Sequence, residues 1–344
     1  MVCSRERPFL QSTSDYEQCV TLLLKKEFIV AEKNFADRLA LAIKDKKTPL
    51  VVGLDPVYEY LPPAITSQPG FSDASSCTAC VDAISEFGRK IIRTVAPHVP
   101  AVKINIAYFE RYLWDGMEAY YNLVQEALGH GLLVIGDVKR GDIGHTSMQY
   151  ALGNLGDCNW HDTGVTLGPD AITISPYFGI DGIAPFVDLA REQGKGAFVL
   201  LRTSNASAGQ IQEIPTTNGW PVFLHVAQLI ANWGDSLRGE CGLSSLGAVV
   251  GATSGAAIAQ IRQAMPHTLF LIPGIGAQGG SLADCASAFR SDGLGAVISA
   301  SRSVIFAHRE SRYADIPAAQ WTNAVQKAVV ETKAQIAQAI PAFQ

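Results

Sequence analysis

Eight short apolar segments recur along the chain and alternate with segments of helical periodicity. They span residues 50–55, 101–107, 132–139, 171–175, 196–202, 246–252, 268–274 and 294–300. Continuous apolar runs of this length are typical of strands buried on both faces, as in parallel sheets. Eight strand–helix units predict an α/β protein with a single (β/α)8 TIM barrel, and a doubly wound open sheet is the alternative.

The helical segments define the expected extent of the domain. Those that fall between the strands span residues 80–96, 117–131, 256–265 and 281–291. Residues 34–47 predict a helix leading into the first strand, and residues 318–340 a C-terminal helix packing on the barrel. We therefore expect a barrel domain over 34–344, preceded by an N-terminal extension at 1–33 that has no clear partner. The long connection at 203–245 follows a strand end and is a candidate active-site lid.

Composition excludes several function classes. Hydrophobic residues make up 48% and charged residues 17%, which suits a packed globular protein. The net charge of −5 argues against a broad nucleic-acid surface. The sequence contains no apolar run of about 18 residues, so we expect no membrane span. The apolar stretch VTLLL is followed at once by Lys25 and Lys26, which makes a poor secretory signal.

Cysteine usage favours a reducing compartment. The seven cysteines are odd in number and scattered, so the cytoplasm is expected and a disulfide framework is not. Cys77 and Cys80 form a CxxC without a second pair at zinc-finger spacing. Two free thiols near a helix start are the simpler interpretation, and a metal or redox site is the alternative. The Asn205-Ala206-Ser207 sequon has no meaning without secretion.

Polar and charged residues stand at the ends of several predicted strands. In a barrel of this kind the active site forms at the carboxyl ends of the strands. The residues found there are Asp55, Lys103, Asp137, Lys139, Asp142 just beyond the third strand, Ser204 and Arg302. These side chains are therefore expected to converge on one site.

Spacing assigns directions to the charges in DVKRGD, residues 137–142. Residues two apart on a strand face the same side, so Asp137 and Lys139 should point into the barrel mouth and Val138 toward the helices. Lys103 can point there from the neighbouring strand, and buried charges should pair with one another. A lysine among buried carboxylates is a candidate proton donor. The alternative is a solvated loop, which is usual for a charged run after a strand.

The segment PGIGAQGG, residues 273–280, satisfies GxGxxG at Gly274, Gly276 and Gly279. A dinucleotide site would require an acid at the end of the next strand, where this chain has Ser301 and Arg302 instead. A phosphate cradle is the simpler interpretation, because glycine-rich backbone N–H groups after strand seven and an arginine after strand eight match the usual phosphate site of such barrels. The alternative is that the glycines only permit a tight turn.

Together these residues resemble the orotidine 5′-phosphate decarboxylase family, whose hallmark DxKxxD is matched by residues 137–142. The resemblance extends over about residues 34–310 and includes GLDP at 53–56, VKINIAYFE at 102–110 and PGIGAQGG. The segments LLRTSN and VVGATS resemble the bacterial subgroup with longer loops. The resemblance implies cofactor-free removal of CO2 from orotidine 5′-monophosphate to give UMP, without metal, by an obligate homodimer.

The resemblance also implies a role for each matching residue. Lys139 would protonate C6, Asp137 would orient Lys139 beside the substrate carboxylate, and Lys103 would bridge Asp137 and the ribose. Asp142 and Thr146 would enter the active site of the neighbouring subunit. The substrate-binding residues would be Asp55, Ile143, Thr146, Ser204, Pro273, Gly276, Gln278 and Arg302.

The chain departs from the family pattern at Ser301, where glycine usually precedes the phosphate arginine; a backbone N–H survives this change. Two other functions remain open. One is that of a sister barrel with the same DxKxxD, the Mg²⁺-dependent 3-keto-L-gulonate 6-phosphate decarboxylase. The other is a catalytically silent barrel that binds UMP as a sensor. Arg140 is expected to be structural or solvent-facing.

Overall fold

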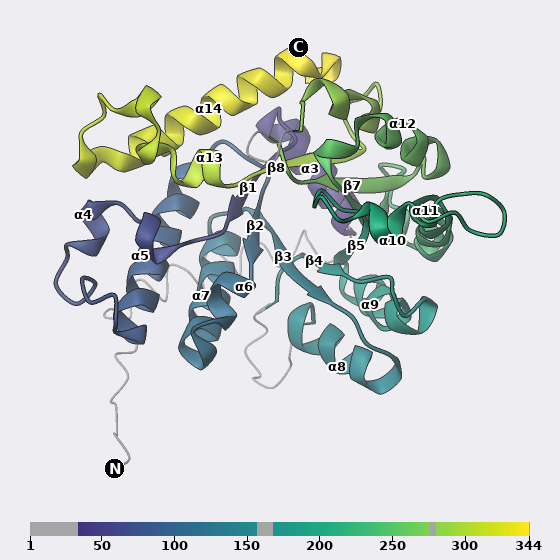
Figure 1. Cartoon of the computed structure of the whole chain (residues 1–344), viewed down its shortest axis with the longest axis horizontal. Helices are drawn as coiled ribbons and strands as arrows, with labels where there is room; N and C mark the ends of the chain where they lie inside the picture. The colour runs from purple at the N-terminus through teal and green to yellow at the C-terminus, as the bar shows by residue number, and fades with distance from the viewer. Residues whose placement is uncertain (1–33, 157–167, 276–279, 344) are drawn as a thin grey trace.

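The computed structural model describes residues 34–156, 168–275 and 280–343, which form a closed parallel barrel with its strands in sequential order (Figure 1). The strands are β1 (Leu50–Leu54), β2 (Ala101–Asn105), β3 (Leu133–Arg140), β4 (Ala171–Ile174), β5 (Gly196–Arg202), β6 (Ser244–Val250), β7 (Thr268–Ile272) and β8 (Ala296–Ala300). The last strand pairs with the first, with Leu50 opposite Ile298. The predicted (β/α)8 barrel is therefore confirmed, and the open-sheet alternative is wrong.

Strand residues alternate between two buried layers. Val51 and Ile135 belong to the apolar cluster inside the barrel, whereas Val52, Val134 and Val138 belong to the cluster between strands and helices. This alternation follows from the two-residue period of a strand. Because both layers are buried, most strand residues are apolar, and a charged side chain within a strand needs a partner.

Helices surround the strands (Figure 1). The longer ones are α5 (Cys77–Val95), α7 (Leu113–Gly129), α8 (Gly144–Asn154), α9 (Ile180–Gln193), α11 (Val222–Trp233), α12 (Gly255–Ala264) and α14 (Trp321–Ala339). The four-residue ones are α4 (Pro63–Thr66), α6 (Ala107–Glu110), α10 (Gly209–Gln212) and α13 (Arg302–Ile305). The 3-10 turns are Tyr58–Tyr60, Asp235–Leu237, Ala252–Ser254, Ala283–Ala288, Ala307–Arg309, Ser311–Tyr313, Ala318–Gln320 and Pro341–Phe343.

Two sequence expectations about elements are corrected. The helix expected at 281–291 is only a 3-10 segment, Ala283–Ala288. Ser281 Oγ accepts a hydrogen bond from Ala283 N, a local alternative to the α-helical pattern that serine often provides. The long connection at 203–245 contains α10 and α11, so the irregular part after β5 is shorter than expected.

The helix α3 (Phe35–Lys46) closes the amino end of the barrel. Its N-cap Asn34 accepts from Asp37 N, and its apolar face joins the inner cluster. The Phe35 ring meets the Phe198 ring edge-on with centroids 5.9 Å apart. Arg38 forms an ion pair with Asp170, whose other oxygen accepts from Val134 N at 2.8 Å. This end is filled with side chains, which leaves the opposite mouth for a site.

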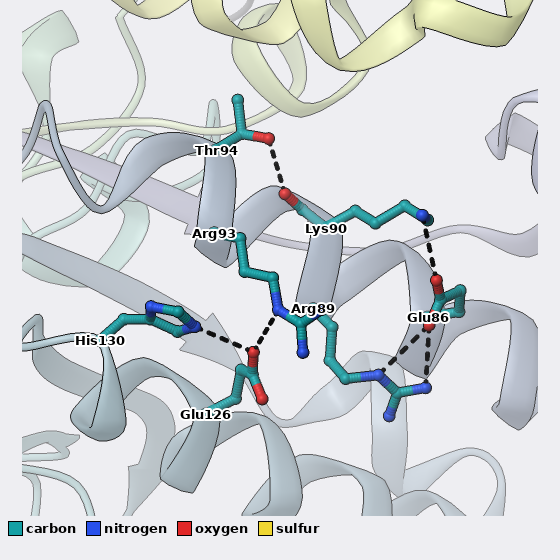
Figure 2. A network of polar contacts seen from close by, with 7 residues as sticks. All are labelled: Glu86, Arg89, Lys90, Arg93, Thr94, Glu126 and His130. Carbon is teal, nitrogen blue, oxygen red and sulfur yellow. Dashed lines mark hydrogen bonds and ion pairs between the residues drawn. The ribbon is translucent and has the colours of Figure 1, made fainter. Parts of the chain in front are cut away.

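On the outside, α5 connects to its neighbours through both surface charges and core contacts. Arg93 of α5 donates to Glu126 of α7 at 2.7 Å, and within α5 both Arg89 and Lys90 form ion pairs with Glu86 (Figure 2). On its buried face, Phe87 stacks on Phe306 and on Trp321 of α14.

Among the described residues, no helix has the length and apolar character to cross a membrane.

Candidate active site

Three neighbouring strands bring a chain of alternating charges to the carboxyl end of the barrel. Lys103 Nζ from β2 lies 2.8 Å from Asp137 Oδ2 on β3 and 3.8 Å from Asp55 Oδ1 after β1. Lys139 Nζ lies 2.5 Å from Asp137 Oδ1. Val138, which separates Asp137 from Lys139 in the sequence, is buried in the apolar cluster between strands and helices. The charges that the sequence placed inside apolar runs therefore meet in one network at the mouth.

Exposure separates the two lysines. The Lys103 side chain is 6% exposed and the Asp137 side chain 10%, whereas the Lys139 side chain is 50% exposed. Lys103 is thus fixed inside the network, and Lys139 stands at its open end. Of the two, Lys139 is the one whose ammonium group an entering substrate can reach directly.

Pairing overrides burial in the protonation of the inner groups. Burial alone would raise the pKa of the Asp137 carboxyl, but Lys103 and Lys139 hold this pKa well below its usual range. Burial would lower the pKa of Lys103, but Asp137 and then Asp55 raise that pKa above its ordinary value. Both groups are therefore charged at neutral pH, and each stabilises the charge of the other.

Asp55 carries an acceptor with no hydrogen-bond partner among the described residues. Its Oδ1 is buried, and the 3.8 Å to Lys103 Nζ is too long for a hydrogen bond. Tyr108 of α6 interacts electrostatically with Asp55, Arg302 and Lys103, and burial is the main cause that raises the pKa of its phenol. The sequence interpretation had not included Tyr108, whose aromatic ring reads as an ordinary core residue.

The carboxyl ends of β5 to β8 supply the remaining candidates. Ser204 follows β5 and packs against Gly251, where an added Cβ would lie 2.9 Å from Ser204 N. Pro273 follows β7 and accepts from Ala252 N at 2.9 Å. Arg302 begins α13 after β8 and is exposed. Gly276, Gln278 and Gly279 lie outside the described residues, as does the extension at 1–33.

The side chain of Ser301 occupies space left by a glycine on β1. A Cβ at Gly53 would lie 1.9 Å from Ser301 Oγ. The serine that departs from the family pattern is therefore directed at the strand backbone of GLDP. In the β1–β2 register Gly53 lies opposite Lys103, so the contact between Ser301 and Gly53 is next to the charge network.

Asp142, Ile143 and Thr146 lie apart from the network. Within the described residues, Asp142 forms no ion pair with Lys103 or Lys139, and its Oδ1 accepts from Ile143 N. Ile143 is 55% exposed, and Thr146 is exposed on α8. Arg140, by contrast, donates to Val138 O and pairs with Glu110 of α6, which makes it a structural link between β3 and α6.

Thr173 of β4 is a polar member of the site that the sequence interpretation missed. It is 1% exposed, accepts from Lys139 N at 3.0 Å and donates to Asp137 Oδ1 at 2.9 Å. The signal that could have found it is a hydroxyl in the otherwise apolar run AITI, on the strand beside the charged one. A threonine there fits strand propensity so well that it attracts no notice.

The arrangement can bind an anion and deliver a proton. A solvent-accessible ammonium group beside a buried carboxylate can protonate a carbanion, and the exposed guanidinium of Arg302 can hold a phosphate. Across residues 34–156, 168–275 and 280–343, no group of three or more His, Cys, Asp and Glu side chains is arranged to hold a metal ion. Cys77 and Cys80 are free thiols on α5.

Comparison with known proteins points to one family. Residues 48–314 match the profile described as "Orotidine 5'-phosphate decarboxylase / HUMPS family". The orotidine 5′-phosphate decarboxylase of Rhodopirellula baltica is 36% identical over 303 residues, covering 88% of this chain and 98% of that protein. The one from Caldicellulosiruptor saccharolyticus is 35% identical over 283 residues, covering 82% and 92%. The structure of Leishmania donovani OMP decarboxylase superposes with a TM-score of 0.66 at 28% identity, covering 89% and 98%.

Proposed function

Because this chain belongs to the orotidine 5′-phosphate decarboxylase family, we propose that the charge network at its barrel mouth removes CO2 from orotidine 5′-monophosphate to give UMP, with Lys139 as the proton donor. The enzyme is thus a carboxy-lyase of pyrimidine nucleotide synthesis. The observation that carries the assignment of roles is the Asp137 carboxylate held between Lys103 and Lys139.

In the proposed reaction the bond between C6 and the carboxylate carbon breaks, and its electron pair stays on C6. CO2 leaves, and a proton moves from Lys139 Nζ to C6; solvent then returns a proton to the amine. Asp137 lies beside the substrate carboxylate and aims the ammonium group. Fixed charges stabilise the developing charge without reorganising, which is how a protein can act here through electrostatics.

Binding is assigned to the residues around the network. Asp55 Oδ1, which has no hydrogen-bond partner among the described residues, accepts from a ribose hydroxyl, and Lys103 bridges Asp137 and the ribose. Ser204 reads the pyrimidine amide edge, and Arg302 binds the phosphate together with Pro273, Gly276 and Gln278. Binding energy from the phosphate, remote from C6, can then be used to hold the reacting carboxylate against Asp137.

We further propose that two copies of the chain complete each other's sites. Asp142, Ile143 and Thr146 do not reach the network of their own chain, and an exposed apolar surface surrounds them. That surface includes Ile143, Tyr150, Tyr177, Phe178 and Ile180, which are 38% to 84% exposed. A Cβ at Gly182 would meet both Asp142 O and Phe178, so these segments are contiguous. Exposed apolar patches of this kind mark interfaces.

Two finer assignments accompany the function. We place the chain in the bacterial subgroup with longer loops, because LLRTSN and VVGATS stand at the ends of β5 and β6 and α10 lies in the connection after β5. We place the enzyme in the cytoplasm, where the free thiols of Cys77, Cys80, Cys241 and Cys285 would stay reduced.

An ultraviolet assay of the purified protein with orotidine 5′-monophosphate tests the proposal. We expect turnover that survives EDTA. Turnover of 3-keto-L-gulonate 6-phosphate that is lost with EDTA would favour the Mg²⁺-dependent sister enzyme. Tight UMP binding without any turnover would favour the silent barrel. The relatives from Rhodopirellula baltica, Caldicellulosiruptor saccharolyticus and Leishmania donovani are all named orotidine 5′-phosphate decarboxylase or OMP decarboxylase, which supports the first outcome.

A further inference from the structure

The hydroxyl of Thr173 connects the two residues of the proposed proton transfer. Lys139 N donates to Thr173 Oγ1 at 3.0 Å, so the hydroxyl proton is left to donate to Asp137 Oδ1, 2.9 Å away. Asp137 Oδ1 also receives Lys139 Nζ at 2.5 Å. A single buried side chain therefore holds the backbone of the lysine and the carboxylate that aims its ammonium group.

The strand register explains why a side chain is needed at this point. Gly136 lies opposite Ile172, and Arg140 lies opposite Ile174, so residues 137–139 of β3 face Thr173 alone on β4. Such a bulge leaves backbone groups of the longer strand without their usual partners. At this point the Thr173 hydroxyl supplies an acceptor for Lys139 N.

The backbone of Lys139 is itself strained. Its φ is +47°, in the left-handed region that residues with a Cβ rarely adopt. The backbone of Lys139 therefore departs from the regular strand on which the sequence prediction of its direction was based. A strained residue persists only where its surroundings hold it, and the bond to Thr173 is one such restraint.

We propose that Thr173 is a positioning residue for decarboxylation, which fixes the Lys139 ammonium and the Asp137 carboxylate relative to each other. The inference rests on the proposed role of Lys139 as proton donor. Thr173 contacts neither the phosphate nor the ribose groups of the proposed site. Its loss should consequently affect the chemical step and leave nucleotide binding largely intact.

The experiment compares variants that keep or remove the hydroxyl. Thr173→Val removes it at nearly constant shape, Thr173→Ala removes it without placing a new methyl beside the carboxylate, and Thr173→Ser keeps it. We expect kcat to fall about ten- to one-hundredfold in Val and Ala, the range for losing a hydrogen bond to a charged group. Thr173→Ser should retain kcat within about threefold. UMP affinity and KM should change by less than about threefold in all variants.

The matched control is Thr48→Val. Thr48 is also 1% exposed, and its hydroxyl also accepts a backbone N–H, that of Leu50 at 3.3 Å. It lies before β1, at the opposite end of the barrel from the charge network. We expect Thr48→Val to lower the melting temperature without lowering kcat, which separates a general stability effect from positioning.

Equal kcat values in Thr173→Ala and Thr173→Ser would overturn the inference, and so would a loss in which KM and UMP affinity change as much as kcat. If Thr173→Val fails to fold, the Ala and Ser pair still decides. Failure of the proposed function is distinguishable, because the wild-type protein would then show no decarboxylation or Lys139→Ala would remain active. An active wild type, an inactive Lys139→Ala and a fully active Thr173→Ala would reject the role of Thr173 alone.

Discussion

At the scale of single residues, the charge of Asp137 depends on Lys103. The pKa of the Asp137 carboxyl is lower in the folded than in the unfolded chain, where it is about 3.9, so ionised Asp137 stabilises the fold at pH values above about 3.9. This stabilisation is lost as the pH falls through the pKa of the folded state. Replacing Lys103 by Met removes one of the two cations and raises the folded pKa. We therefore expect acid unfolding, followed by circular dichroism, to begin at higher pH in Lys103→Met. Lys90→Met, at a surface lysine paired with Glu86, is the control; equal acid transitions in the two variants would contradict the pairing.

The contact between Gly53 and Ser301 predicts that position 53 requires glycine. A Cβ at position 53 would lie 1.9 Å from Ser301 Oγ and 3.0 Å from its Cβ. We expect Gly53→Ala to lower the melting temperature and weaken phosphate binding, because Ser301 must move and Arg302 follows it. Adding Ser301→Gly should restore both, since the next nearest atom, Ser301 Cα, is 3.5 Å away. A double variant as defective as Gly53→Ala would show that Ser301 is not the cause.

The proposed phosphate binding by Arg302 can be tested with a substrate that lacks the phosphate. Arg302→Ala should lower kcat/KM for orotidine 5′-monophosphate by about ten- to one-hundredfold, the range for a lost charge-assisted hydrogen bond. With orotidine, which lacks the phosphate, the variant and the wild type should have the same kcat/KM. A similar loss on both compounds would mean that Arg302 supports the fold and does not bind phosphate.

Some residues of the site could be predicted from sequence and others could not. Lys103, Asp137 and Lys139 are conspicuous because each interrupts an apolar run, where an unpaired charge is too unfavourable to tolerate. Thr173 was missed because a threonine is an ordinary strand residue. The left-handed backbone at Lys139 was also unpredictable, since it lies in the bulge between β3 and β4 and position 139 is not a glycine, the usual sequence sign of such a conformation.

At the scale of elements, α5 tests which contacts hold the helices to the barrel. Phe87 is fully buried between Phe306 and Trp321, whereas the Arg93–Glu126 pair of Figure 2 lies at the surface, with the Arg93 side chain 59% exposed. We expect Phe87→Ala to lower the free energy of unfolding by about 3–5 kcal/mol. Arg93→Ala should lower it by less than about 1 kcal/mol. Denaturant unfolding of both variants measures this, and comparable losses would contradict the ranking.

The elements themselves were largely predictable. All eight strands appear where apolar runs occur, because burial on both faces leaves a continuous signal in a parallel barrel. Helix periodicity located α3, α5, α7, α12 and α14. It failed at 281–291, where local side-chain hydrogen bonding favours a 3-10 turn, and it did not predict α8, α9 or α11.

At the scale of the whole molecule, the proposed dimer predicts complementation between inactive chains. Asp142→Ala removes a residue assigned to the partner's site, and Lys103→Ala removes one from its own. A heterodimer of the two has one site with both residues intact, so mixing should restore part of the activity. The control is each variant alone, taken through the same mixing procedure. Subunit exchange shown by differently tagged chains, without any recovery of activity, would argue against shared sites.

The proposed function requires Lys139 to deliver the proton from the end of a network built on Asp137. It is tested most directly by measuring decarboxylation of orotidine 5′-monophosphate and UMP affinity in Lys139→Ala. The Lys139 side chain is half exposed, and its ammonium group pairs with Asp137 alone among the described charged groups, so its removal should leave the fold and the phosphate-binding residues in place. We predict loss of nearly all turnover with UMP affinity retained. Substantial turnover in Lys139→Ala would rule out Lys139 as the proton donor.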